Sequence, residues 1–486
     1  LGAVKTNLGH GETVAGMSGL LKAALVLQEQ TVPPHLHLQE PNPQVDWQAH
    51  PFEIPTTLRP LDARYVGVSA FGFSGTNAHV VLERAPEPPA LTAAPRAIHV
   101  LPLSARSDDA LVALAHALAD HLESRPDLPL QHVALTLATG RVRFRHRLAV
   151  VAGDRDEAIA GLRAVGSPGA DVVRGLASER PPTLAFAFTG QGSQGRAMAR
   201  DLSALSPAFG ATLQRLDRDL DGHALSDLLT RDDPAIDQTR WTQPGLVGLQ
   251  LGLAALWRAW GVLPDVVLGH SVGEIAAAAV AGVVDAERAM ALVDARASLM
   301  QALPAGGAMI AAQTSEAAVE DLLRGQDDLS LAAVNSADAV VLSGGEAAVR
   351  RAEVALLARG VPVQRLVVSH AFHSGRMAPM LADFARAIEG IAFGAPKLPF
   401  VSALAGDLVG REIAGPAYWV EHVRAPVRFD AALQGAVAAG AELFLELGPH
   451  HTLTALAARA FPELPRVPSL RRGTPGPRSL ARAVAG

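Results

Sequence analysis

Ser271 stands in a sequence pattern that suits nucleophilic catalysis. The motif GHSVG at 269–273 follows an apolar run at 263–268 and precedes an alanine-rich segment. A buried strand, a sharp glycine turn and a helix in this order lift a serine hydroxyl into a pocket and aim helix N–H groups at developing negative charge. The flanking segments therefore favour a nucleophile elbow over the alternative, a surface Gly-Ser turn.

Two histidines are candidates for the base that a serine hydroxyl needs at neutral pH. His370 and His373 lie in SHAFHS at 369–374, directly after a predicted strand at 361–368, where a loop could return to the cleft of the main domain. A His-x-x-His pair can also bind a metal, but no third ligand of suitable spacing lies nearby, so we expect no metal. Against the other alternative, two ordinary surface histidines, the pattern favours a catalytic base.

Two further features could complete such a site. The motif GQGSQ at 190–194 follows a predicted strand at 183–188, and its N–H groups could form part of an oxyanion hole or only an ordinary glycine-rich turn. The residues alone leave both readings open. Arg296 lies on an amphipathic helix soon after the elbow. An arginine on a helix usually faces solvent, but pointing inward its planar fork would suit a carboxylate.

The elements that would position these side chains belong to the last of three units. The chain has 486 residues, which corresponds to roughly three domains. Proline-rich stretches at 86–95 and 180–182 predict units at 1–86, 87–180 and 181–465, with a tail rich in Arg, Pro and Gly at 466–486. In the middle unit 148–151 is a predicted strand, and Ser107 is expected to cap a helix. The apolar face of that helix would comprise Leu111, Leu114, Leu118 and Leu122.

Periodicity within the third unit predicts a subdomain inserted at about 305–369. Strands are expected at 307–313, 331–334, 340–343 and 361–368, with helices from Ser315 to residue 324 and over 347–359. This βαββαβ order is the ferredoxin-like motif. We therefore expect an α/β fold, in which a hydrolase-like parallel sheet domain carries a ferredoxin-like insert and follows a small α+β domain.

Composition narrows the chemistry and the partners. The chain contains no cysteine, which excludes disulfides, thiolate metal sites and a thiol nucleophile. A formal net charge of −6 argues against a nucleic-acid partner. No apolar run approaches the ~18 residues needed to span a bilayer, so we expect no membrane partner. The first residues show neither an initiator Met nor a signal peptide, and we expect the chain to come from the middle of a larger protein.

The third unit resembles the acyltransferase domain of modular polyketide synthases and the malonyl-CoA:acyl carrier protein transacylases of fatty-acid synthesis. The resemblance runs from about residue 183 to 465. It rests on several motifs in order: GQGSQ at 190–194, GHSVG at 269–273, Arg296, NS at 335–336, HAFH at 370–373, YW at 418–419, PVRF at 426–429 and GPH at 448–450.

The resemblance implies a role for each residue of the predicted site. Ser271 would be the nucleophile, His373 the base and Arg296 the clamp on a substrate carboxylate. The N–H groups of Gln191 and Val272 would form the oxyanion hole. A backbone carbonyl near His422 would orient His373 in place of the acid of a triad; family members commonly have Asn or Gln at this place.

The resemblance also bears on which acyl group is chosen. His270, His370 and Phe372 would act in specificity, because HAFH at 370–373 together with Val272 resembles the malonyl-selecting pattern, as opposed to the YASH type linked with methylmalonyl. A bulky Phe372 would crowd an α-methyl group. Because a pocket distinguishes one methyl group by only ~1–3 kcal/mol, we expect good but not absolute selectivity.

The first unit resembles the carboxyl-terminal end of a ketosynthase. The segment VKTNLGH at 4–10 matches its Lys and second His motif, through Lys5 and His10, and GVSAFGFSGTNAH at 67–79 matches its glycine-rich closing motif. The family's cysteine and first histidine would lie before Leu1, so we expect this fragment by itself not to condense acyl chains. The middle unit would then be the linker between ketosynthase and acyltransferase, and the tail the linker that follows the acyltransferase.

The predicted function is therefore transfer of a malonyl group from malonyl-CoA to the phosphopantetheine thiol of an acyl carrier protein, through a seryl ester. The resemblance implies no bound cofactor, a cytoplasmic location, and partnership with the carrier protein, the ketosynthase and other domains of one synthase. The alternatives are a serine hydrolase such as a thioesterase, which shares the elbow, and a docking scaffold without catalytic activity.

Overall fold

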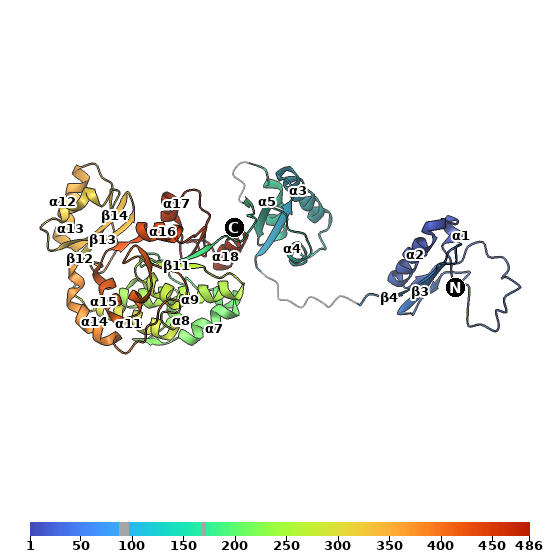
Figure 1. Ribbon diagram of the computed structural model, residues 1–486, viewed down its shortest axis with the longest axis horizontal. Helices are drawn as coiled ribbons and strands as arrows, with labels where there is room; N and C mark the ends of the chain where they lie inside the picture. The colour runs from blue at the N-terminus through green and yellow to red at the C-terminus, as the bar shows by residue number, and fades with distance from the viewer. Residues whose placement is uncertain (87–96, 168–171) are drawn as a thin grey trace. The chain divides into compact units, whose positions relative to one another are not determined.

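The computed structural model describes residues 1–86, 97–167 and 172–486 (Figure 1). The chain divides into two compact units, Leu1–Ala94 and Pro95–Gly486. The proline-rich stretch predicted as a linker at 86–95 lies, apart from Pro86, outside the described residues. No helix within the described ranges is both long and apolar enough to cross a membrane.

The first unit has little core of its own. Its main helix, α2, buries only Ala23 and Leu27, and contacts the antiparallel hairpin formed by β3 and β4. Most residues of that hairpin are exposed. The elements are α1 (Lys5–Leu8), η1 (Glu12–Val14), α2 (Ala15–Glu29), β1 (Thr31–Val32), β2 (Arg59–Pro60), β3 (Tyr65–Phe71) and β4 (Asn77–Glu83).

The second unit begins with a small α+β region that has a separate hydrophobic core. Its three strands form an antiparallel sheet in the order β5-β6-β7. Ser107 caps α3 as predicted, because its Oγ accepts the Ala110 N–H at 3.2 Å. The elements are β5 (His99–Ala105), α3 (Asp108–Ser124), α4 (Leu130–Thr139), β6 (His146–Ala152), α5 (Arg155–Ala164) and β7 (Val173–Leu176).

The predicted apolar face of α3 is wrong at one position. Leu114 is 41% exposed, whereas the buried stripe contains Leu111, Ala115, Ala119 and Leu122. Residue 114 lies about 60° around the helix from residue 111, on the side away from this stripe. Small alanines fill the positions that let the helix approach the sheet.

A six-stranded sheet forms the centre of the larger part. Its order is β17-β16-β11-β8-β19-β20, and all neighbours are parallel except β17, which runs antiparallel to β16. Every residue of β8 and β11 is buried, as expected for central strands covered on both faces. The strands are β8 (Leu184–Phe188), β11 (Val266–Gly269), β16 (Phe400–Ser402), β17 (Asp407–Val409), β19 (Leu443–Leu447) and β20 (Arg466–Pro468).

Helices pack around this sheet, and three of them contact one another: α9 (Thr239–Ala259), α10 (Gly273–Val280) and α11 (Ala286–Gln301). The other elements before the insert are α6 (Leu202–Leu205), α7 (Pro207–Leu216), β9 (Asp219–Leu220), β10 (His223–Ala224), α8 (Leu225–Thr230) and η2 (Pro234–Asp237). Those after it are η4 (Gly375–Met380), α14 (Leu381–Ile388), η5 (Arg411–Ile413), α15 (Pro416–Arg424), β18 (Val427–Arg428), α16 (Phe429–Ala438) and α17 (Thr452–Ala460).

The ferredoxin-like insert is confirmed. Its four strands pair antiparallel in the order β15-β12-β14-β13, and β18 of the main domain extends this sheet beside β13. The elements are β12 (Gly307–Ala312), η3 (Ala317–Val319), α12 (Glu320–Leu323), β13 (Leu329–Ser336), β14 (Ala339–Gly345), α13 (Glu346–Ala358) and β15 (Val363–Arg365). The helix expected after Ser315 is a 3-10 turn followed by one short α-turn, and the last strand is shorter than 361–368.

The tail packs against both regions of the second unit. Strand β20 is the edge of the central sheet and lies beyond the predicted boundary at residue 465. Helix α18 (Gly476–Ala485) contacts β5 and β6 of the small region. There Arg478 Nη2 pairs with Glu157 Oε2 at 2.6 Å, and this hydrogen bond lowers the pKa of Glu157 to about 2.

Candidate active site

Ser271 occupies the sharp turn between β11 and α10, and its backbone is strained. Its φ is +50°, a left-handed conformation that a residue with a side chain rarely adopts. The flanking glycines are required by close packing. A Cβ on Gly269 would lie 2.3 Å from the Glu274 nitrogen, and one on Gly273 would lie 2.2 Å from the Phe188 oxygen. The strand, turn and helix predicted for a nucleophile elbow are therefore present.

His373 lies within hydrogen-bond distance of the serine. Its Nε2 is 2.7 Å from Ser271 Oγ, and its Nδ1 is 2.8 Å from the carbonyl oxygen of Ala425. A carbonyl can only accept, so Nδ1 carries the proton and Nε2 is free to accept the serine proton. Burial, followed by the charge of Arg296, holds the pKa of His373 well below its usual range. The imidazole is therefore a neutral base at neutral pH.

His370 is committed to other contacts. Its Nε2 lies 2.9 Å from the carbonyl oxygen of Leu303, and its Nδ1 lies 2.9 Å from Ser369 Oγ. Both ring nitrogens have partners, so neither is available to Ser271. Nowhere in the described ranges do three or more His, Asp or Glu side chains gather as metal ligands would.

Arg296 points into the site rather than to solvent. Its side chain is buried at 2% exposure, its Nη1 donates to Gln243 Oε1 at 2.6 Å, and its Nη2 lies 3.5 Å from Ser271 Oγ. Burial lowers the pKa of Arg296 to about 10, which leaves it charged at neutral pH. Its Nε has no partner, and no carboxylate of the described residues lies within ion-pair distance.

The motif at 190–194 reaches the same edge of the sheet. Phe188 at the end of β8 pairs with Gly269 at the end of β11. Gln191 lies three residues after Phe188, and Val272 lies three residues after Gly269. In the described chain, neither of their N–H groups donates to another backbone or side-chain group. An oxyanion hole needs N–H groups without a partner in the protein, so the role predicted for Gln191 and Val272 stays a prediction.

Two side chains for which the sequence predicted no role, Gln243 and Asn335, hold these groups in place. Gln243 of α9 accepts from Arg296 and donates from Nε2 to Gln191 Oε1 at 3.1 Å. Asn335 of β13 lies with Oδ1 2.9 Å from His270 Nε2, which fixes the residue before the serine to the insert. Burial lowers the pKa of His270. A glutamine in a helix that is otherwise buried on nearly every side is the one available sequence signal for Gln243.

The remaining predicted residues are Phe372, Lys5 and His10. Phe372 is 7% exposed and packs in the core, with its ring centroid 6.2 Å from that of His370. Lys5 and His10 are exposed in the first unit, where His10 Nδ1 accepts the Glu12 N–H at 2.9 Å.

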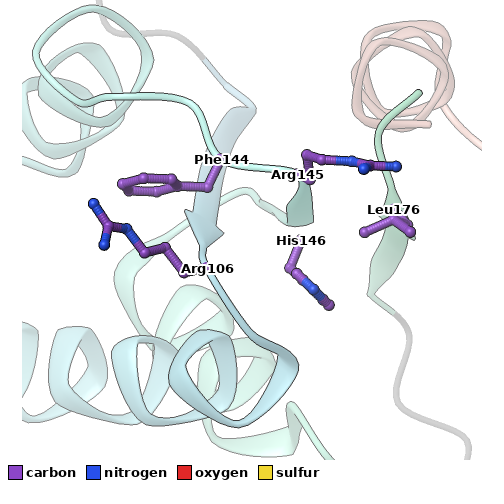
Figure 2. Close-up of a pocket in the computed structure, with 5 residues that line it drawn as sticks. All are labelled: Arg106, Phe144, Arg145, His146 and Leu176. Carbon is purple, nitrogen blue, oxygen red and sulfur yellow. The ribbon is translucent and has the colours of Figure 1, made fainter. Parts of the chain in front are cut away.

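A separate hollow of about 400 Å³ lies in the small α+β region (Figure 2). Figure 2 shows Arg106 beside Phe144, and the guanidinium carbon lies 5.5 Å from the ring centroid. Arg145, His146 and Leu176 complete its lining. The segment 141–147 contributes four arginines, a local positive charge that the net charge of −6 conceals. The hollow contains no nucleophile paired with a base.

The fold and the Ser271–His373 pair define the class of α/β enzymes with a candidate serine nucleophile. The chain belongs to the acyl transferase family, because the sequence profile described as "Acyl transferase domain" matches residues 185–483. Two further profiles match upstream: "Beta-ketoacyl synthase, C-terminal domain" at 1–39 and "CurL-like, PKS C-terminal" at 99–162. The predicted family and α/β fold are thereby confirmed.

Relatives of known identity agree with this assignment. Polyketide synthase GfsB of Streptomyces halstedii is 41% identical over 509 residues that include 100% of this chain, although the chain spans only 9% of that protein. The acyl transferase domain of SpnD, solved in complex with 2-(pent-4-yn-1-yl)malonyl, is 33% identical with a TM-score of 0.73, covering 80% of this chain and 95% of that one. The malonyl CoA-acyl carrier protein transacylase of Coxiella burnetii is 30% identical with a TM-score of 0.57, covering 63% and 97%.

Proposed function

We propose that this chain loads a malonyl group from malonyl-CoA onto the phosphopantetheine thiol of an acyl carrier protein, through an ester on Ser271. One observation carries the choice of a carboxylated acyl group. Arg296 is buried, keeps its charge, has no carboxylate partner among the described residues, and lies 3.5 Å from the nucleophile. A buried guanidinium without a counter-charge is costly, and a substrate carboxylate would supply that charge.

The first half-reaction forms the ester. Ser271 Oγ attacks the thioester carbonyl while His373 Nε2 accepts the hydroxyl proton, and the N–H groups of Gln191 and Val272 stabilise the oxyanion. The carbon–sulfur bond then breaks, and CoA leaves as the thiol with the proton from His373. Loss of one oxyanion donor typically costs ~10²–10³ in rate.

The second half-reaction reverses these roles. The phosphopantetheine thiol gives its proton to His373 Nε2 and attacks the seryl ester. When the carbon–oxygen bond breaks, His373 returns the proton to Ser271 Oγ. Because Nδ1–H remains bonded to the Ala425 carbonyl throughout, the ring keeps one orientation for both transfers.

Selectivity follows from Arg296 and the core around it. An acetyl group would leave the guanidinium unpaired, so acetyl-CoA should be a poor substrate. The malonyl derivative bound by the related SpnD domain supports a carboxylated substrate. Phe372 would crowd an α-methyl group and favour malonyl over methylmalonyl by ~1–3 kcal/mol. His270 and His370 would act indirectly in this selectivity, through Asn335 and Ser369.

The rest of the chain would serve the synthase rather than the chemistry. We propose residues 1–86 as the end of a ketosynthase, 87–180 as the linker between ketosynthase and acyltransferase, 181–465 as the acyltransferase and 466–486 as the following linker. Lys5 and His10 would be ketosynthase residues. The carrier protein and the other synthase domains would be its partners.

Intact-mass analysis after incubation with malonyl-CoA tests the proposal. A malonyl adduct that persists on the wild type and is absent from Ser271→Ala is the expected result. A thioesterase would instead release free malonate without an acceptor, and a docking scaffold would show neither product. The carbonyl of Ala425, where a hydrolase triad would place a carboxylate, argues for transfer.

A further inference from the structure

A second buried histidine, His422, lies close to the proposed base His373. His422, in the last turn of α15, is 3% exposed, and its ring centroid is 6.3 Å from that of His373 at an interplanar angle of 84°. Neither ring nitrogen of His422 has a hydrogen-bond partner among the described residues. An imidazole buried without any hydrogen bond requires an explanation, because an unsatisfied polar group costs free energy.

A buried carboxyl group lies within ion-pair distance of His422. Glu274, in the first turn of α10, is fully buried, and its Oε2 lies 3.7 Å from His422 Nε2. The hydroxyl of Tyr418 and the N–H of Ala403 donate to the same carboxylate, the latter at 3.0 Å. Neither donor carries a positive charge. Among the described residues, His422 is the one basic side chain within ion-pair distance of Glu274.

We propose that Glu274 holds His422 as an imidazolium, and that this buried pair is a positioning device that keeps His373 neutral and able to act as the base. The inference rests on the proposed function of His373. His422 does not touch the reacting atoms, so it acts only through the electrostatic field at His373.

The field at His373 has four sources besides burial. Arg296, His422 and His270 disfavour a positive charge on the ring, whereas the Ala425 carbonyl favours one, and the net result is the lowered pKa of His373. Two unit charges 6.3 Å apart at an effective dielectric constant of about 20 change proton affinity by roughly tenfold to a hundredfold. The charge of Glu274 offsets part of this, so we expect a contribution near tenfold.

This contribution would help both halves of the reaction. A neutral His373 can accept the serine proton at a pH where an ordinary histidine is partly protonated. The imidazolium formed during attack then lies among positive neighbours and gives its proton readily to the leaving thiolate. The titratable groups that contact His422 or act on it electrostatically are Glu274 from α10, His373 from the loop after β15, Tyr418 from α15 and His270 from the elbow. Arg296 from α11 acts on His373.

The test is the pH dependence of malonyl loading in single-turnover experiments. In wild type the loading rate should fall on the acidic side of its pH profile, and we call this fall the acid limb. In His422→Gln and in Glu274→Gln we expect the acid limb to lie about one pH unit higher. Above pH 8 the loading rate of both variants should stay within about threefold of the wild-type rate. The double variant should shift no further than either single variant, because both act through one imidazolium. Glu421→Gln, which removes an exposed carboxylate from the same helix, should leave the limb in place.

Other outcomes overturn the inference. An unmoved acid limb in His422→Gln, or an equal loss of rate at every pH, would show that His422 only fills space. Should that variant fail to fold, His422→Asn and the ¹⁵N spectrum of histidine-labelled wild type decide: the proposal requires one buried imidazolium at pH 7.5 that disappears in Glu274→Gln. If wild type forms no malonyl adduct at any pH, the proposed function fails, whereas the imidazolium can still be observed.

Discussion

The Ser271 site and the hollow of the small α+β region both contain arginine, but in opposite environments. Arg296 is 2% exposed and has no carboxylate partner among the described residues. The Arg145 side chain, one of those in Figure 2, is 56% exposed and pairs at 3.2 Å with Glu179, whose side chain is 84% exposed. Water and the ion pair with Glu179 screen the charge of Arg145, whereas the buried charge of Arg296 is available to a ligand. Burial, not residue type, therefore distinguishes a binding arginine from a surface one.

Among substitutions in the two regions, removal of the base His373 should decrease the rate of malonyl loading most. His373→Ala should slow malonyl loading by ~10²–10⁴, because proton transfer in the transition state is lost. His370→Gln is the matched control, since both nitrogens of His370 are used in structural hydrogen bonds. Rapid-quench measurement of the malonyl adduct checks both. An equal loss in the two variants would mean that the cleft depends on general packing and not on the Ser271–His373 pair.

The pH profile should show a moderate effect. Because the pKa of His373 lies well below its usual value of 6.5, the neutral base persists below that pH. The loading rate should thus stay constant from pH 7.5 to 6.5 and fall only in more acidic buffer. In the same acidic range the unfolded chain binds a proton that native His373 does not, so stability should also fall as the pH drops below 6.5. A loading rate that halves at pH 6.5 contradicts this assignment.

The smallest effect should come from the surface hollow. Arg145→Ala and Arg106→Ala should leave malonyl loading within about twofold of wild type, because exposed ion pairs and surface cations contribute little. Single-turnover loading at two salt concentrations is the measurement. A large decrease from either substitution would mean that the hollow takes part in loading, and would remove the contrast between the two regions.

The elbow and the insert could be predicted from sequence because their signals are local. The glycines around Ser271 and the alternating apolar residues in the insert predict the conformation of the segments in which they occur. The orientation of Arg296 could not be predicted, because it depends on how α11 packs against α9. The Ala425 carbonyl leaves no side-chain signature, since any residue could supply it. Leu114 was misplaced because the stripe on α3 is set by alanines as well as leucines.

The most direct test of the central claim is the acyl preference of Arg296→Ala. Wild type should load malonyl in strong preference to acetyl from equal concentrations of the two CoA thioesters. In Arg296→Ala, malonyl loading should fall by at least about a hundredfold, as expected when a charge-assisted contact worth roughly 3 kcal/mol is lost. Acetyl loading should be retained or rise, and Arg106→Ala should keep the wild-type preference. Unchanged malonyl loading in Arg296→Ala would contradict the account.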